Sequence, residues 1–165
     1  MSAPQATGWK RIDKAAFGIV YCAITGLSIL LAAGDHPEAP YETAGVLFGS
    51  VLAITLTKAF AEFLSHALDS GERLTRAGWR AAWRHSAPTL ATANLPTLLF
   101  VANGLGWIAP ATAVIASQGV CVALLAFIGG RIGWVIDGRA AQSLLGATFA
   151  GGVGLALAVL KHIIH

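Results

Sequence analysis

Three ionisable residues recur at every fourth position of one otherwise apolar stretch, namely Lys58, Glu62 and His66. At about 100° per residue they share one face of a helix, with Thr55 and Asp69 beside them. Carboxylates and imidazoles can both exchange protons near neutral pH when their surroundings favour it. The spacing therefore predicts a hydrated path for an ion or a proton. A second interpretation is a Lys58–Glu62 ion pair that neutralises two charges and packs against a partner helix.

A metal site on the same face is a weaker alternative. Glu62, His66 and Asp69 have the spacing of metal ligands on a helix. However, no second Glu-x-x-His helix supplies the remaining ligands, and the ammonium group of Lys58 would repel a cation. Haem held by two histidines is also disfavoured, because no histidine falls in the middle of an apolar stretch. We therefore predict no metal and no other cofactor.

The sequence contains no recognisable catalytic set. Paired carboxylates, a Ser-His-Asp set and a Cys-His set are all missing, and the glycines do not have phosphate-loop spacing. Cys22 and Cys121 both lie in apolar stretches, where cysteine behaves as a small hydrophobic residue. We therefore predict no catalytic residues and a protein that is not an enzyme. An enzyme that handles a lipid or a quinone is the remaining alternative.

The elements that carry these residues are predicted to be membrane helices. Of the 165 residues, 56% are hydrophobic and only 12% are charged, whereas a water-facing surface needs about a quarter or more of charged residues. This composition excludes a soluble enzyme and a free nucleic-acid-binding module. With about 20 apolar residues per span, we predict an all-α fold, a single membrane domain over residues 1–165. Its five transmembrane helices are expected at 15–33, 44–68, 87–107, 111–130 and 141–160.

The polar face inside the second predicted span is energetically unusual. An ionisable side chain at bilayer depth costs about 2.5–3.5 kcal/mol on insertion scales. Lys58 is expected near the middle of this span, Glu62 about one turn toward the cytoplasm and His66 at the inner mouth. This face is therefore expected to contact protein or water rather than lipid.

A charged segment at 72–85 follows the second span, and its four arginines are spaced to share one stripe of a helix. We predict an amphipathic helix at the cytoplasmic membrane surface, capped by Asp69 or Ser70. Each basic residue near an anionic bilayer contributes about 1 kcal/mol, so anionic lipid headgroups are the expected partner. A topology-setting loop without a specific partner is the other interpretation. The lipid-facing residues are Arg73, Arg76, Arg80 and Arg84.

The distribution of basic residues predicts the orientation. If the N-terminus is cytoplasmic, only Lys161 lies on the outer side, so the positive-inside rule favours a cytoplasmic N-terminus and an outer C-terminus. The apolar stretch of the first span exceeds the core of a signal peptide, so we expect this span to be retained. The residues expected on the inner side are Lys10, Arg11, Lys14, Arg73, Arg76, Arg80, Arg84, Arg131 and Arg139.

Uncharged polar residues mark the third and fourth spans, and small residues mark the fifth. The polar residues are expected to bond helix to helix, with lining of a polar path as the alternative. In the fifth span, Ala150, Gly154 and Ala158 recur every four residues and predict a packing face, either within one subunit or between subunits. The polar residues are Asn94, Asn103, Ser117 and Gln118.

Three segments resemble a group of small, uncharacterised bacterial integral membrane proteins with several spans. They are the run from Lys58 to Glu62, the segment from Arg84 to Pro88 followed by Pro96, and the ending from Leu160 to His165. The likeness covers residues from about 45 to the end. In that group the second span tends to read His-x-Tyr-Ala-Glu. The resemblance implies that Glu62 is a family feature, that Lys58 is a variable partner, and that the protein lies in the bacterial cytoplasmic (inner) membrane.

Together these patterns predict a small ion or proton channel or transporter with a polar path along the second span. Glu62 would act as the gate, Lys58 as its counter-charge and His66 as a proton relay at the inner mouth. Since five short helices enclose little space, a homo-oligomer is expected; the permeant ion is not specified by the sequence. The alternative is a non-conducting structural or accessory membrane protein, in which the same face packs against a partner helix.

Overall fold

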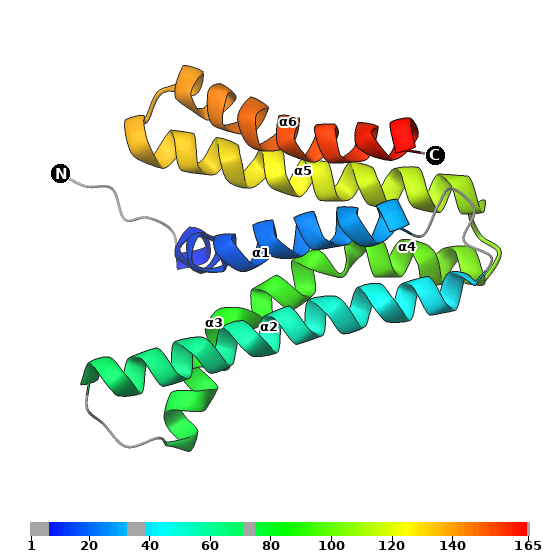
Figure 1. Ribbon diagram of the computed structural model, residues 1–165. Helices are drawn as coiled ribbons and strands as arrows, with labels where there is room; N and C mark the ends of the chain where they lie inside the picture. The colour runs from blue at the N-terminus through cyan, green and yellow to red at the C-terminus, as the bar shows by residue number, and fades with distance from the viewer. Residues whose placement is uncertain (1–6, 33–38, 71–74, 165) are drawn as a thin grey trace.

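The computed structural model describes residues 7–32, 39–70 and 75–164. Within these ranges every regular element is an α-helix and no strand is present, which confirms the all-α prediction. The helices, labelled in Figure 1, are α1 (Thr7–Ala32), α2 (Pro40–Ser70), α3 (Arg76–Ala93), α4 (Leu95–Gly104), α5 (Pro110–Asp137) and α6 (Ala140–Ile164).

Four of these helices are long and apolar enough to cross a membrane. They correspond to the first, second, fourth and fifth predicted spans. α4 is also apolar but has only 10 residues, which is too short for a hydrocarbon core of about 30 Å at about 1.5 Å per residue. Length and composition thus indicate a multi-pass membrane protein. The four apolar segments are Ala15–Ala32, Pro40–Asp69, Pro110–Asp137 and Ala140–Leu160.

α1, α2, α4, α5 and α6 run back and forth roughly along one direction, and α3 lies oblique to them (Figure 1). α1 lies between the α5–α6 hairpin and the group formed by α2, α3 and α4. α1, α3 and α6 begin at the end of the bundle where α2 and α5 finish. We call this the basic end, because five arginines lie at or near it: Arg76, Arg80, Arg84, Arg131 and Arg139.

The segment between α2 and α5 breaks at a different place from the prediction. The interfacial helix expected over 72–85 and the span expected over 87–107 are not separate, because α3 continues without interruption to Ala93. The break falls at Asn94, whose φ and ψ of −88° and 0° are not helical. Pro96 accounts for this position, since it has no N–H to donate to the carbonyl group four residues earlier.

The cap of α3 also differs from the prediction. α2 continues through Asp69 to Ser70, so neither residue caps the next helix. Instead the hydroxyl oxygen of Thr75 accepts a hydrogen bond of 3.1 Å from the backbone N–H of Gly78. This is the usual role of threonine at a helix N-terminus. The expected position of Arg73 on this helix lies outside the described residues.

Apolar clusters fill the interior that the structure describes. At the end opposite the basic end, α1, α2, α4 and α5 meet in a cluster in which Phe100 and Leu30 are fully buried. At mid-depth a gap lined by residues of α1, α2, α4 and α5 measures about 10 Å³, near the minimum that one water molecule needs. The cluster consists of Leu30, Ala44, Leu47, Phe100, Ala113 and Val114.

Glycines hold α5 and α6 together at very short range. A Cβ atom on Gly129 would overlap the carbonyl oxygen of Gly146, and a Cβ atom on Gly146 would overlap that of Gly129. Ser143 adds a hydrogen bond of 2.9 Å from its hydroxyl group to the carbonyl oxygen of Gly130. On Gly154, a Cβ atom would lie 2.8 Å from a methyl group of Leu125. Small residues of the fifth predicted span, Gly154 among them, therefore pack within one subunit.

Candidate functional site

α2 carries the predicted polar face toward α1 and α3. Lys58 and Glu62, one turn apart, form an ion pair in which Nζ and Oε1 are 3.8 Å apart. The Lys58 side chain is 10% exposed and the Glu62 side chain 37%. This distance is longer than a charge-assisted hydrogen bond, so the pair neutralises charge without a short contact. The ion pair expected from the sequence is present, with lysine as its buried member.

The stem of Lys58 lies beside Gly18 of α1, next to Thr89 of α3. A Cβ atom on Gly18 would lie 2.6 Å from Oγ1 of Thr89 and 3.3 Å from Cδ of Lys58. Only glycine on α1 leaves room for both neighbours. Gly18 is three residues from the start of the apolar segment Ala15–Ala32, or about 5 Å along the helix. Lys58 therefore lies nearer the basic end than the mid-span position expected from the sequence.

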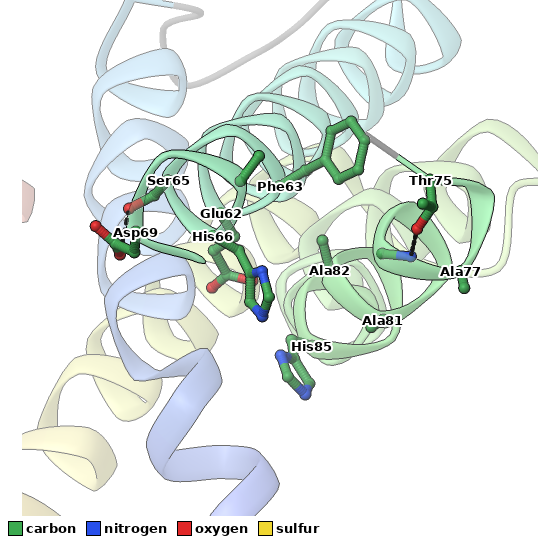
Figure 2. A pocket seen from close by; sticks show the side chains of 12 residues that line it. Glu62, Phe63, Ser65, His66, Asp69, Thr75, Ala77, Ala81, Ala82 and His85 are labelled. Carbon is green, nitrogen blue, oxygen red and sulfur yellow. Dashed lines mark hydrogen bonds between the residues drawn. The ribbon is translucent and has the colours of Figure 1, made fainter. Parts of the chain in front are cut away.

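A groove of about 580 Å³ opens between α2 and α3 at the basic end. We call it the α2–α3 groove. Figure 2 shows His66 of α2 and His85 of α3 on its facing sides, with Ser65 and Asp69 nearby. The hydroxyl group of Ser65 donates a long hydrogen bond of 3.5 Å to Asp69. The groove thus brings together three residues predicted from the sequence, Glu62, His66 and Asp69.

The wall of this groove is fixed by an aromatic contact between α2 and α3. The rings of Phe63 and Trp79 meet edge to face, with centroids 5.7 Å apart and planes at 82°. Ala82 is buried beside them on α3. Because this contact and Ala82 hold one face of α3 against α2, the arginines of α3 are left on its exposed side. The exposed arginines are Arg76, Arg80 and Arg84.

A second groove, of about 630 Å³, opens between α1 and α2; we call it the α1–α2 groove. Phe17 and Tyr21 form its wall on α1, stacked with ring centroids 6.3 Å apart. Lys58 and Glu62 line it from α2, so Glu62 contributes to both grooves. Oε2 of Glu62 is buried and has no hydrogen-bond partner among the described residues.

Thr55 is not part of either groove. It is fully buried, and its hydroxyl group donates a hydrogen bond of 2.8 Å to the carbonyl oxygen of Val51. A threonine that bonds back to its own helix presents a methyl group to its neighbours. The prediction that Thr55 lines the path is therefore not supported by its contacts, and the polar face ends at Lys58.

The uncharged polar residues of the third and fourth predicted spans hold turns or lie in the interior. Asn103 donates a hydrogen bond of 2.8 Å to the carbonyl oxygen of Ile108 in the α4–α5 connection. The side chain of Asn94 donates a hydrogen bond of 2.8 Å to the carbonyl oxygen of Leu90 in the last turn of α3. Ser117 is fully buried, and Gln118 is partly buried. None of these four residues lines either groove.

The sequence interpretation missed an ion pair that joins α1 to α5. Arg131 donates to both carboxylate oxygens of Asp13, with distances of 3.1 and 3.2 Å. It also missed Tyr21 and Thr89 as neighbours of Lys58. Phe17 and Tyr21 are four residues apart, so their shared face is readable from the sequence. The sequence does not show which helix this face contacts.

Among the described residues, no three His, Cys, Asp or Glu side chains come together as a possible metal site. Comparisons of this chain with protein-family models, with curated proteins and with solved structures found no match. The resemblance to small bacterial membrane proteins thus stays a prediction, and the function has to be argued from the two grooves.

Proposed function

We propose that this protein moves a proton or a small ion across a membrane, with Glu62 as the group that holds it during transfer. One observation carries the proposal: Glu62 lines both grooves, and its Oε2 atom is buried without a hydrogen-bond partner among the described residues. A carboxylate oxygen withdrawn from water is costly unless it receives a proton or a cation. Lys58 supplies the counter-charge, and His66 relays protons from the α2–α3 groove.

One-sided access favours a transporter over a permanently open channel. The α2–α3 groove leads from the basic end to Glu62. Beyond Lys58 the interior is closed by the apolar cluster around Phe100 and Leu30. A membrane transporter exposes its central site to one side at a time. The arrangement therefore fits a transporter whose site is open toward the basic end.

The proposal includes five crossings, with α3 and α4 together as the third. α2 ends at the basic end and α5 begins at the opposite end, so the chain between them passes along the bundle (Figure 1). A break in a membrane helix is tolerated where neighbouring groups satisfy the freed backbone. By the positive-inside rule the basic end faces the cytoplasm, with the C-terminus outside. Arg76, Arg80 and Arg84 then contact anionic headgroups.

The proposal also includes a homo-oligomer, because one chain provides no continuous path in the part that the structure describes. The outer face of α2 is open to a neighbour. Gly45 and Gly49 are exposed, and a Cβ atom on either would meet nothing within 4 Å. Small residues four positions apart allow membrane helices to approach closely.

A non-conducting scaffold is the second candidate, and the closed apolar half of the bundle favours it. In that case the Lys58–Glu62 pair only neutralises two charges at the contact between helices. Replacing such a pair by apolar residues is often neutral or stabilising. The two candidates therefore differ in what replacement of both Lys58 and Glu62 by apolar residues does. It abolishes transport in the first, and in the second it leaves the stability of the protein unchanged or raises it.

Proton and ion flux in sealed liposomes tests the proposal. Purified wild-type protein is expected to dissipate an imposed pH or ion gradient, and Glu62→Gln to reduce the rate to that of empty vesicles. Asp13→Asn is the matched control, because Asp13 is a carboxylate at the basic end that lines neither groove. Wild-type vesicles that hold every gradient, or equal rates for wild type and Glu62→Gln, would refute transport through Glu62.

A further inference from the structure

The α1–α2 groove changes in polarity along its length. Its lining on α2 runs from Glu62 and Lys58 to Ile54 and Ala53, a distance of about 13 Å at about 1.5 Å per residue. The charged end lies toward the basic end of the bundle, and the apolar end lies toward its middle. A phospholipid in the leaflet at that end has the same order, with its headgroup outermost and its acyl chains toward the centre of the bilayer.

The two charges in the groove also follow a definite order. Lys58 is the deeper and more buried residue, and Glu62 lies one turn closer to the basic end and is more exposed. In an aminophospholipid the phosphate group is attached to the glycerol, and the ammonium group lies farther out. A headgroup in the groove would therefore place its phosphate near Lys58 and its ammonium group near Glu62.

We propose that the α1–α2 groove is a binding site for a zwitterionic aminophospholipid from the leaflet at the basic end. The volume of about 630 Å³ is in the range of ligand sites in proteins. Ala61 leaves room along its floor, and Phe17 and Tyr21 form an apolar wall. Phe17 is 73% exposed and Tyr21 53%, so this wall is open to the surrounding bilayer.

The net charge of the site selects the type of headgroup. Lys58 and Glu62 cancel, so an anionic headgroup would gain the attraction of Lys58 but meet the repulsion of Glu62. A zwitterionic headgroup matches both charges. Between zwitterionic lipids, a primary ammonium group donates hydrogen bonds to a carboxylate and a quaternary one cannot. Phosphatidylethanolamine is therefore expected to bind better than phosphatidylcholine, and both better than phosphatidylglycerol.

This inference does not depend on transport. A lipid in the α1–α2 groove would meet Glu62 from the bilayer side, whereas the α2–α3 groove reaches the same residue from the basic end. The lipid site can therefore be present in a non-conducting protein, and transport can occur without lipid selectivity. Flux measurements and lipid-binding measurements report on the two proposals separately.

Lipid retention by the purified chain tests the site. The full-length protein is stripped of lipid in detergent and then given phosphatidylethanolamine, phosphatidylcholine or phosphatidylglycerol with identical acyl chains. Bound lipid is counted by native mass spectrometry, and thermal unfolding is followed in parallel. The wild type is expected to retain phosphatidylethanolamine about tenfold better than phosphatidylglycerol, the effect of one charge-assisted hydrogen bond.

Two charge swaps separate recognition from a merely structural ion pair. Lys58→Glu with Glu62→Lys keeps a pair but reverses its order, so the preference for phosphatidylethanolamine is expected to vanish. Asp13→Arg with Arg131→Asp reverses a pair outside the groove and is expected to keep the preference. Equal retention of the three lipids by the wild type, or a preference that survives the first swap, would overturn the proposal.

A third variant keeps the test decisive if the first swap does not fold. Ala61→Phe fills the groove and leaves both charges in place, since Ala61 is an exposed residue of its lining. It is expected to lose bound phosphatidylethanolamine while its helix content stays that of the wild type. Unchanged lipid retention in Ala61→Phe would show that the lipid binds elsewhere and would exclude this groove.

Discussion

Substitution of Gly146 by alanine tests the packing of α5 on α6. A Cβ atom on Gly146 would overlap the carbonyl oxygen of Gly129. Because the obstacle is backbone, no side chain can rotate away, and the helices have to separate. Overpacking typically costs about 1–3 kcal/mol, whereas alanine in place of glycine in a helix gains up to about 1 kcal/mol. If overpacking costs about 3 kcal/mol and the gain from alanine offsets about 1 kcal/mol of it, Gly146→Ala is expected to destabilise the protein by about 2 kcal/mol.

Gly119→Ala is the matched control for this prediction. Gly119 lies on α5, is exposed, and has no atom within 4 Å of the place where a Cβ would lie. Its substitution is expected to leave the free energy of unfolding unchanged or to raise it by up to about 1 kcal/mol. The assay is circular dichroism in mixed micelles as the fraction of denaturing detergent is raised. Equal stabilities for Gly146→Ala and Gly119→Ala would refute the close packing of α5 on α6.

Three further substitutions are expected to lower the free energy of unfolding in the same assay. Asp13→Ala removes the bidentate partner of Arg131 and should lower the free energy of unfolding by about 1 kcal/mol, since both groups are partly exposed. Because salt screens such a pair, the same loss of stability in high salt as in low salt would contradict this prediction. Asn103→Leu removes the hydrogen bond to the carbonyl oxygen of Ile108 and should cost about 1–3 kcal/mol. Thr75→Ala removes the cap of α3 and should cost about 1 kcal/mol, whereas Thr75→Ser should cost little.

Hydropathy was sufficient to predict the four long apolar helices, because each is a nearly uninterrupted apolar segment bounded by polar residues. It was not sufficient to predict how the chain divides between α2 and α5. The charges before residue 86 indicated a boundary there, but a helix is interrupted by lost backbone hydrogen bonds and not by a change in polarity. The break falls at Asn94, two residues before Pro96, while α3 continues past Pro88, so the presence of a proline alone does not show where the helix breaks.

The polar face of α2 was predictable for a similar reason. Lys58, Glu62 and His66 are four residues apart, and helical geometry alone puts them together. Their neighbours on other helices were not predictable, because spacing within one helix does not show which helix it meets. Gly18 admits the stem of Lys58 and the hydroxyl group of Thr89 to the same place, and nothing in the sequence links these positions. The two grooves at Glu62 follow from that packing.

Access to Glu62 from the basic end is the central claim, and cysteine labelling measures it most directly. In a background with Cys22 and Cys121 replaced by alanine, Ser65→Cys, Glu62→Cys and Thr55→Cys are each treated with a membrane-impermeant maleimide from the side that the basic end faces. Positions 65 and 62 line the α2–α3 groove, and Thr55 is fully buried. We predict rapid labelling at 65 and 62 and none at 55. Protection of position 62, or labelling of position 55 as fast as that of 65, would contradict the account.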